Sequence, residues 1–191
     1  MTTVVLGFPG SAVTADCVSM LEQAGHTVVV QSPPNFLAGN FDRESEYIIT
    51  VTRELELRQA LGERIDQENL KRATFVHHSC WVDPTAVIEP GCFISPFCTI
   101  ASRTVISKDC YFAPYCLVGH VTTVGRYCLF TPTVAIAGGC NIGERCRFGI
   151  RSAVIDYIDI ASDCEIGASA LVTKSIAESG KYVGSPARRV K

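Results

Sequence analysis

The sequence predicts a small α/β domain followed by a parallel β-helix that is built from a six-residue repeat. Three observations lead to this fold class. Large apolar residues recur every six positions in the second half of the chain, small residues precede them by two positions, and prolines and glycines follow them closely. The first 75 residues lack the repeat and alternate apolar runs with helix-like segments. We expect domains at 1–75 and 76–176 and a C-terminal tail at 177–191.

Length and composition exclude several classes of protein. The chain has 191 residues, of which 47% are hydrophobic and 19% are charged, so it can bury a substantial core. A net charge of −2 is too close to neutral for a protein that binds nucleic acid through its charge. No apolar run reaches the ~18 residues of a membrane span, and the first residues lack the charged region of a signal peptide. We expect a soluble, cytoplasmic protein with neither a membrane nor a nucleic-acid partner.

The first 75 residues are expected to form a βαβ unit. Thr3–Leu6 is an apolar strand, and the turn Gly-Phe-Pro-Gly-Ser follows it. Apolar residues at helical spacing predict a helix over Val13–Ala24, which Gly25 ends. Strand, glycine-containing turn, helix and strand in this order are typical of a small Rossmann-like domain. The other expected elements are strands at Thr27–Val30 and Tyr47–Val51 and helices at Arg53–Leu61 and Asp66–Leu70.

The six-residue period runs without interruption from Val82 to Val172. Neither an α-helix, with its period of 3.6, nor an alternating strand, with its period of 2, produces such a pattern. A short strand and a two-residue corner, repeated three times, close a triangular coil of eighteen residues, so residues eighteen apart stack. The apolar residues of the period are Val82, Ile88, Ile94, Ile100, Ile106, Phe112, Val118, Val124, Phe130, Ile136, Ile142, Phe148, Val154, Ile160, Ile166 and Val172.

Nine of the ten cysteines share one position of the repeat, two residues before the apolar residue. Alanine, serine and threonine take most of its other occurrences, so we interpret the position as inward-facing and the cysteines as small core residues. Stacked side chains on parallel strands point the same way, which disfavours disulfides. No CxxC pair occurs, and we expect no metal site.

Among the four histidines, only His120 is a candidate for catalysis. It stands at a corner two residues after Val118, where prolines stand in other repeats, so its side chain is expected to project outward. An exposed imidazole can act as a general base at neutral pH, although a solvated surface residue is the alternative interpretation. No second histidine lies near it, which excludes a zinc site of three ligands. His26 is expected at a surface or edge, and His77 and His78 in a structural role.

The repeat region and the tail carry motifs that resemble one family of enzymes. The segments are CLVGHVTTVG at 116–125, AIAGG at 135–139, FGIRS at 148–152, IGA at 166–168, VTK at 172–174 and VGSPAR at 183–188. They are similar to the sialic acid O-acetyltransferase and UDP-4-amino-sugar N-acetyltransferase family of hexapeptide-repeat acyltransferases. The order of a small βαβ domain, a β-helix and a short tail is similar too. The resemblance implies a left-handed β-helix and a homotrimer that transfers acetyl from acetyl-CoA to a sugar or nucleotide-linked amino sugar in surface glycan biosynthesis.

The resemblance also implies roles for residues of the β-helix. His120 matches the general base of the family. The backbone N–H of Gly138, one coil above His120, is expected to face the acetyl oxygen of the cofactor and stabilise negative charge on it. Ile150 and Ala168 are expected to line the path of the pantetheine arm.

The tail and the first domain supply the remaining expected binding residues. Arg188 and Arg189 offer partners for the phosphates of acetyl-CoA, with a solvated terminus as the alternative. The turn that contains Gly7, Gly10 and Ser11 stands where the family has a Gly-Gly-His-type turn that helps to hold the nucleotide sugar, so these residues are expected to contact the acceptor. This chain departs from that motif with Phe8-Pro9-Gly10-Ser11, and Thr52 replaces a glycine after the third strand.

The sequence departs from the family pattern beside His120. The family follows its catalytic histidine with Asp or Glu, whereas this chain has Val121, and Leu129 replaces a second histidine that some members carry. Either another group is therefore expected to orient His120, or the reaction relies on a less activated base. Ser102 and Asp156 share its corner column, and Ser102 is the nearer candidate. Two alternatives stay open: a catalytically silent repeat protein that binds a ligand or scaffolds partners, and an acyltransferase for a non-sugar acceptor.

Overall fold

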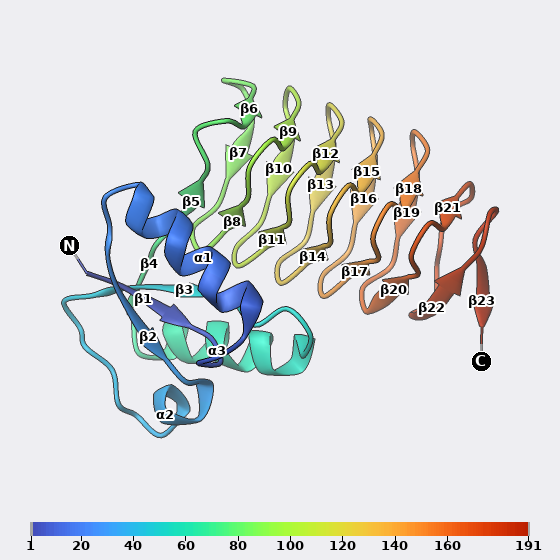
Figure 1. The fold of residues 1–191 in the computed structure, drawn as a ribbon. Helices are drawn as coiled ribbons and strands as arrows, with labels where there is room; N and C mark the ends of the chain where they lie inside the picture. Colours follow the sequence, from blue (N-terminus) through green and yellow to red (C-terminus); the bar gives the residue numbers. More distant parts are fainter. Residues whose placement is uncertain (1, 191) are drawn as a thin grey trace. The chain divides into compact units, whose positions relative to one another are not determined.

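The computed structural model describes residues 2–190 and divides them into two compact units (Figure 1). The first unit extends to Phe75 and includes Pro90–Phe93, and the second comprises Val76–Glu89 and the residues from Ile94 onward. Within residues 2–190, no helix is both long enough and apolar enough to cross a membrane.

The first unit contains a parallel sheet in the order β2-β1-β3-β4, with three helices. The predicted order of strand, helix and strand is confirmed, and one helix, α3, replaces the two that were expected between residues 53 and 70. The helix α2 and the strand β4 were not predicted. The bounds are β1 Thr2–Leu6, α1 Ala12–Gln23, β2 Thr27–Gln31, α2 Pro33–Leu37, β3 Glu46–Ile49, α3 Leu55–Gln67 and β4 Lys71–Arg72.

The core of the first unit forms around the central strand β1. Val4 and Leu6 are buried with the apolar side chains of β3 and α3, among them Ile49 and Leu61. On α1, the buried residues Cys17 and Leu21 lie about one turn apart, so a single face of the helix packs inward. This arrangement places the turn after β1 and the loop after β3 at the same edge of the sheet, since the strands are parallel.

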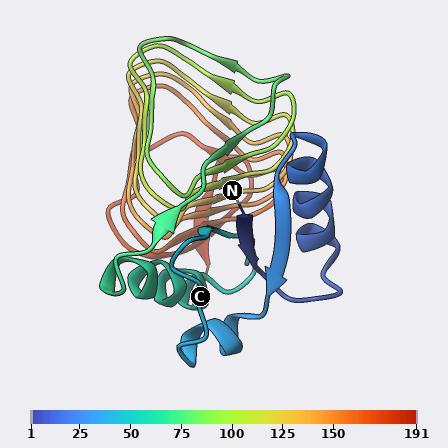
Figure 2. The ribbon, with the colours of Figure 1, turned by 90° about the vertical axis from the view of Figure 1, so that its left-hand side faces the viewer.

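The second unit is a stack of triangular coils, and Figure 2 views the coils nearly along the axis of the stack. Strands of mostly two residues alternate with corners and form three sheets with parallel pairing, except that β22 and β23 pair antiparallel. One sheet has the strands β6 Trp81–Val82, β9 Thr99–Ile100, β12 Leu117–Val118, β15 Ala135–Ile136, β18 Ala153–Val154 and β21 Leu171–Val172. The second has β7 Val87–Ile88, β10 Val105–Ile106, β13 Thr123–Val124, β16 Asn141–Ile142 and β19 Asp159–Ile160. The third has β5 Phe75–Val76, β8 Phe93–Ile94, β11 Tyr111–Phe112, β14 Leu129–Phe130, β17 Arg147–Phe148, β20 Cys164–Ile166, β22 Gly180–Val183 and β23 Arg188–Val190.

The register of the stack is eighteen residues, as the repeat predicts. Val118 pairs with Ile136, and Ile136 pairs with Val154. The apolar residues of the repeat are buried from Ile94 to Val172, and stacked phenylalanine rings occupy the third sheet. The strands β22 and β23, which lie in the predicted tail, extend this sheet, because β22 pairs in parallel with β20.

The cysteines of the second unit point inward and are free, as expected. Most of their thiols donate to a carbonyl oxygen fifteen residues ahead in the next coil, for example Cys128 to the oxygen of Gly143 at 3.1 Å. Thr104 and Thr122 make the same contact with their hydroxyl groups. A thiol or hydroxyl group at this position can therefore satisfy a carbonyl oxygen of the next coil, which suits cysteine and threonine.

The corners have two residues with different backbone demands. The second residue is left-handed at the corners from Gly91 to Ser169, including the β-branched Val121 at φ 56°. A β-branched side chain is strained in this region, where glycine and asparagine are favoured. The first residue tolerates proline, because its N–H lies outside the ladder between coils, as at Ile150 and Ala168.

Candidate active site

The first residues of the corners form three columns along the second unit. The His120 edge carries Ser102, His120, Gly138, Asp156 and Lys174. The Ile150 edge carries Pro96, Pro114, Pro132, Ile150 and Ala168. The third edge carries the ion pairs of Arg126 with Glu144 and of Arg145 with Asp163, which link successive coils. Two neighbouring edges are separated by one side of the triangular coil, which spans six residues or roughly 15 to 20 Å.

His120 lies exposed at its edge, with its ring over Gly138 of the next coil. A Cβ atom added to Gly138 would lie 2.5 Å from Cε1 and 2.6 Å from Nε2 of His120. Only glycine leaves room for the ring in this place, so the two residues that the sequence paired are in contact. The backbone oxygen of His120 accepts the N–H of Gly139 at 2.8 Å, which fixes the corner itself.

Asp156 approaches Gly138 from the coil on the other side. Its Oδ1 accepts the N–H of Gly138 at 3.0 Å. We expected this N–H to face the acetyl oxygen of a cofactor, whereas the structure engages it with a carboxylate. Charge-assisted bonds to backbone N–H groups are short and favourable, which explains why the exposed carboxylate takes this position.

Tyr157 completes the surroundings of the glycine pair, and sequence reasoning did not find it. A Cβ atom added to Gly139 would lie 2.5 Å from Cδ1 of the Tyr157 ring, which is 77% exposed. We call the surface of Gly138 and Gly139, between His120 on one side and Asp156 with Tyr157 on the other, the glycine notch. Two adjacent glycines at one corner are the sequence signal that marks it.

The imidazole of His120 forms no hydrogen bond within residues 2–190. Ser102, which the sequence favoured as its partner, contributes only its backbone oxygen to the corner, accepting the N–H of Val121 at 2.8 Å. The ring is therefore oriented by packing on Gly138, and both of its nitrogens are open to a ligand.

The Ile150 edge holds the other residues expected at the cofactor. A cavity of about 310 Å³ is lined by Thr131, Arg147, Gly149, Ile150, Glu165, Ile166, Gly167 and Ala168. The column changes from proline to Ile150 and Ala168 at this cavity, so backbone N–H donors appear there. Among the described residues, neither N–H has an acceptor. Within one chain, this edge and the His120 edge are different edges of the triangular stack.

The two arginines of the C-terminal segment differ in their surroundings. Arg189 forms an ion pair with Glu178 at 2.5 Å and also donates to the oxygen of Ser179. Arg188 is exposed and donates only to the neighbouring oxygen of Ala187. Of the two predicted phosphate partners, Arg188 thus has the guanidinium without an acidic neighbour in the described chain.

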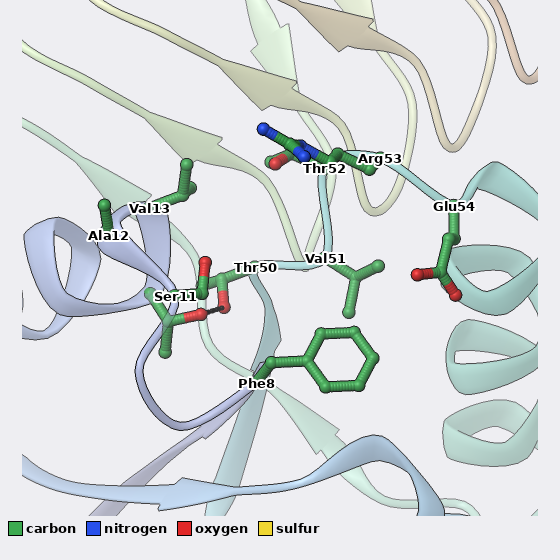
Figure 3. Close-up of a pocket in the computed structure, with 10 residues that line it drawn as sticks. Phe8, Ser11, Ala12, Val13, Thr50, Val51, Thr52, Arg53 and Glu54 are labelled. Carbon is green, nitrogen blue, oxygen red and sulfur yellow. Dashed lines mark hydrogen bonds between the residues drawn. The ribbon is translucent and has the colours of Figure 1, made fainter.

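A cavity of about 370 Å³ lies in the first unit, at the edge where β1 and β3 end and α1 begins (Figure 3). Ser11 lines it and precedes α1 without capping the helix, so its hydroxyl is free of that role. Gly7 and Gly10 do not line it. Gly7 makes room for the hydroxyls of Thr14 and Thr50, which contact each other at 3.3 Å, and Gly10 forms the turn at φ 86°.

Sequence reasoning missed most of this cavity. Thr50, Arg53 and Glu54 enter it from the loop after β3 (Figure 3). The carboxyl ends of parallel strands are the usual ligand sites of such sheets, and this rule was the signal that was available. A larger cavity of about 640 Å³ lies beside β2 and is lined in part by Gln31, Asn35, Phe41 and Tyr47.

The other histidines have structural contacts. Nδ1 of His26 lies 2.9 Å from Oγ1 of Thr3, and Nδ1 of His77 lies 2.8 Å from Oγ of Ser79. The rings of His77 and His78 are 4.1 Å apart. Burial and the neighbouring His78 lower the pKa of His77. Within residues 2–190, no group of three potential metal ligands occurs.

No protein-family model matches the sequence, and no curated protein matches it by sequence. Solved structures do match. PerB from Caulobacter crescentus, in complex with CoA and GDP-perosamine, has a TM-score of 0.88 at 21% identity over 100% of this chain and 98% of its own. The acetyltransferase domain of PglB from Neisseria gonorrhoeae has a TM-score of 0.92 at 16% identity over 99% of both chains. WeeI from Acinetobacter baumannii has 0.69 at 17%, again over 99% of both chains. These likenesses confirm the predicted fold, an α/β unit followed by a left-handed parallel β-helix.

Proposed function

We propose that this chain is an acetyl-CoA-dependent acetyltransferase that modifies the amine or hydroxyl of a sugar, with a nucleotide-linked sugar as the preferred acceptor. The contact between the exposed His120 ring and Gly138 carries the proposal, because it holds an imidazole whose nitrogens make no hydrogen bond to residues 2–190 at an edge of the triangular stack. The fold gives it context. PerB was solved with CoA and GDP-perosamine, and the PglB domain was also solved with acetyl coenzyme A.

His120 acts as the general base in this proposal. One ring nitrogen accepts a proton from the acceptor, whose nitrogen or oxygen then forms a bond to the thioester carbonyl carbon. The carbon–sulfur bond breaks, and the sulfur leaves with its electron pair and takes up a proton. The packing of the ring on Gly138 limits its rotation, which keeps the nitrogen directed at the acceptor without a carboxylate at position 121.

The Ile150 edge suits the pantetheine arm of the donor. Pantetheine contains two amides, whose carbonyl oxygens need donors, and Ile150 and Ala168 offer N–H groups at a cavity of about 310 Å³. Gly149 lies beside them, and a Cβ added there would lie 2.5 Å from the Ala168 nitrogen and 2.7 Å from the carbonyl carbon of Gly167 in the next coil. Acetyl-CoA supplies the activated thioester there. Arg188 is the preferred partner for its phosphates, because Arg189 is already paired with Glu178.

A site that uses both edges requires more than one copy of the chain. His120 and Ile150 stand at different corners of the triangular coil, roughly 15 to 20 Å apart along one side. Each copy carries both edges, so a ring of copies can place the His120 edge of one beside the Ile150 edge of the next. We therefore propose a homotrimer with three equivalent sites. Light scattering in solution would give the mass of three chains.

The first unit provides the proposed site for the nucleotide of the acceptor. The polar residues that line the cavity of about 370 Å³ include Ser11 at the start of α1 and, after β3, Thr50, Thr52, Arg53 and Glu54. Helix N-termini and arginines bind phosphates well, which suits a sugar diphosphate. A cytoplasmic setting fits the proposal, because the free thiols of this chain persist in a reducing compartment.

The runner-up is a repeat protein that binds a ligand without turnover. Two observations favour it, namely Val121 in place of an acid and the lack of a hydrogen bond between the His120 ring and any of residues 2–190. Acyl transfer to a non-sugar acceptor is a third possibility with the same donor site.

A two-part experiment separates these functions. If the protein binds acetyl-CoA, a saturating concentration of it should raise the melting temperature, whichever of the three functions holds. Release of free CoA is then measured with nucleotide-linked amino sugars, sialic acids and simple amines. Turnover with a sugar supports the proposal, binding without any turnover supports the runner-up, and turnover with simple amines alone supports the third function.

A further inference from the structure

The glycine notch contains an acid that the proposed reaction does not use. Asp156 directs its carboxylate to the floor of the notch, where Oδ1 accepts the Gly138 N–H at 3.0 Å. Its second oxygen, Oδ2, has no partner within residues 2–190, and Lys174, the next residue of the column, forms no ion pair with it. A carboxylate oxygen with unused acceptor capacity therefore borders the floor on which the His120 ring lies.

The two groups border the same glycine. No hydrogen bond or ion pair joins the His120 ring to Asp156. Both nevertheless contact Gly138, with Nε2 of His120 2.6 Å from the position of an added Cβ and Oδ1 of Asp156 3.0 Å from the nitrogen. Standard backbone geometry then limits the distance between the ring and the carboxylate to roughly 8 Å. The glycine contributes no side chain to the space between them.

Asp156 and the His120 ring both accept hydrogen bonds, so together they favour a ligand group with several donors. A carboxylate only accepts hydrogen bonds, and a neutral imidazole presents one accepting nitrogen. An ammonium group has three N–H donors and a positive charge, so it can satisfy both acceptors at once. A hydroxyl has a single proton, so one of the two acceptors would face oxygen lone pairs without a bond, which is unfavourable.

We propose that Asp156 selects a primary amine over a hydroxyl as the acceptor, by binding its ammonium form through Oδ2 opposite His120. This inference rests on the proposed function, whose acceptor class it narrows. Asp156 is a specificity residue, and His120 remains the base. The hydrogen bond that Asp156 accepts from the Gly138 N–H positions its carboxylate on the same glycine as the ring, without a direct bond between the two side chains.

The transfer from an ammonium balances as follows. One proton of R–NH₃⁺ passes to the free ring nitrogen of His120, which leaves the neutral amine. The nitrogen lone pair forms the bond to the thioester carbonyl carbon, the carbon–sulfur bond breaks, and its electron pair leaves on sulfur. A second nitrogen proton ends on sulfur to give the thiol, and His120 releases its proton to solvent. The products are the acetamide, CoA and one proton.

The test compares matched acceptors in three variants. The acceptors are a 4-amino-4,6-dideoxyhexose and its 4-hydroxy counterpart, each linked to GDP and to UDP, with acetyl-CoA as donor. We expect the unaltered protein to favour the amine by at least tenfold in kcat/KM. Asp156→Asn should lower this preference about tenfold or more, mainly through a higher KM for the amine, with the hydroxyl acceptor unaffected. Asp156→Glu, which keeps the charge, should retain part of the preference.

Asp159→Asn is the matched control. It removes the same charge three residues away, on the outer face of β19, where Asp159 accepts a hydrogen bond from Asn141 at 2.7 Å. We expect it to keep the full amine preference. An Asp156→Asn protein with unchanged preference, or with equal losses for both acceptors and a lower melting temperature, would overturn the inference.

Failure of the proposed function has a different signature. If the unaltered protein transfers no acetyl group to any acceptor, the proposed function fails, and the inference is decided by calorimetry with the same sugar pairs. A preference of at least tenfold in Kd for the amine, lost in Asp156→Asn, then supports amine selection. Equal affinities, or no binding of either sugar, overturn it.

Discussion

Replacing Gly138 with alanine should abolish most of the activity while leaving the fold intact. The added Cβ would lie 2.5 Å from Cε1 and 2.6 Å from Nε2 of His120. Carbon atoms in contact are about 3.5 to 4.0 Å apart, so the ring must move by about 1 Å or more. A misplacement of this size can cost about 100-fold in rate. We therefore expect kcat/KM to fall about 100-fold.

The effect on stability should be small, because the atom that must move is the end of an exposed side chain. Gly138 has an ordinary backbone conformation, so alanine adds no strain and reduces the entropy of the unfolded chain, a gain of about 0.4–1 kcal/mol. The lost packing of the exposed ring offsets part of this gain. The free energy of unfolding should stay within about 1 kcal/mol of its original value.

Gly125→Ala is the matched control, since its added Cβ meets backbone. The nearest atoms are the nitrogen of Glu144 and the carbon of Gly143, both at 2.7 Å, and neither can rotate away. Overpacking of this kind costs about 1–3 kcal/mol, so this variant should unfold at a lower urea concentration.

Steady-state rates and urea unfolding of the two variants decide the question together. The expected pattern is lost turnover with retained stability for Gly138→Ala, and lost stability for Gly125→Ala. Turnover within threefold of the original in Gly138→Ala would refute the reasoning. Equal destabilisation of both variants would refute it as well, because the ring would then not be the part that yields.

Three further predictions concern stability. Val121→Asn should raise the free energy of unfolding by about 1 kcal/mol, because Val121 is strained at φ 56° and its exposed side chain buries little; an unchanged urea midpoint would contradict this. Cys128→Phe should destabilise by about 1–3 kcal/mol or more, because Cys128 is fully buried between coils; a native-like melting temperature would place its side chain outside the core. Burial raises the pKa of Cys128, and the neighbouring Cys116 thiol raises that of Cys98 to about 12. Above about pH 9 the unfolded chain therefore loses thiol protons that the folded chain keeps, so stability should fall as pH rises, and a flat urea midpoint from pH 8 to 10.5 would contradict it.

The second unit was predictable almost residue by residue. A hydrophobic period of six residues is compatible with few backbone arrangements. The small residues two positions before the apolar ones then indicate which side chains point inward. The outward position of His120 and its pairing with Gly138 followed from the same spacing. In the first unit, α2 begins with two consecutive prolines, Pro33 and Pro34, which suit a first helical turn but were not used as a start signal.

The details of the site depend on side-chain directions that spacing does not determine. Asp156 shares a column with His120, yet the column does not say whether its carboxylate reaches back to Gly138 or out to solvent. Ser102 is nearer in the column and still makes no bond to the ring. The cavity of the first unit is formed by residues after β3, and their approach to Ser11 depends on tertiary packing.

The measurement that tests the central claim most directly is acetyl transfer by His120→Asn under conditions where donor binding is verified. The substitution keeps a polar side chain at an exposed corner, so the melting temperature and the Kd for acetyl-CoA should not change. Single-turnover release of CoA with the best acceptor should be at least 100-fold slower. A rate within threefold of the original, at equal acetyl-CoA affinity, would show that the imidazole at this edge is not the base.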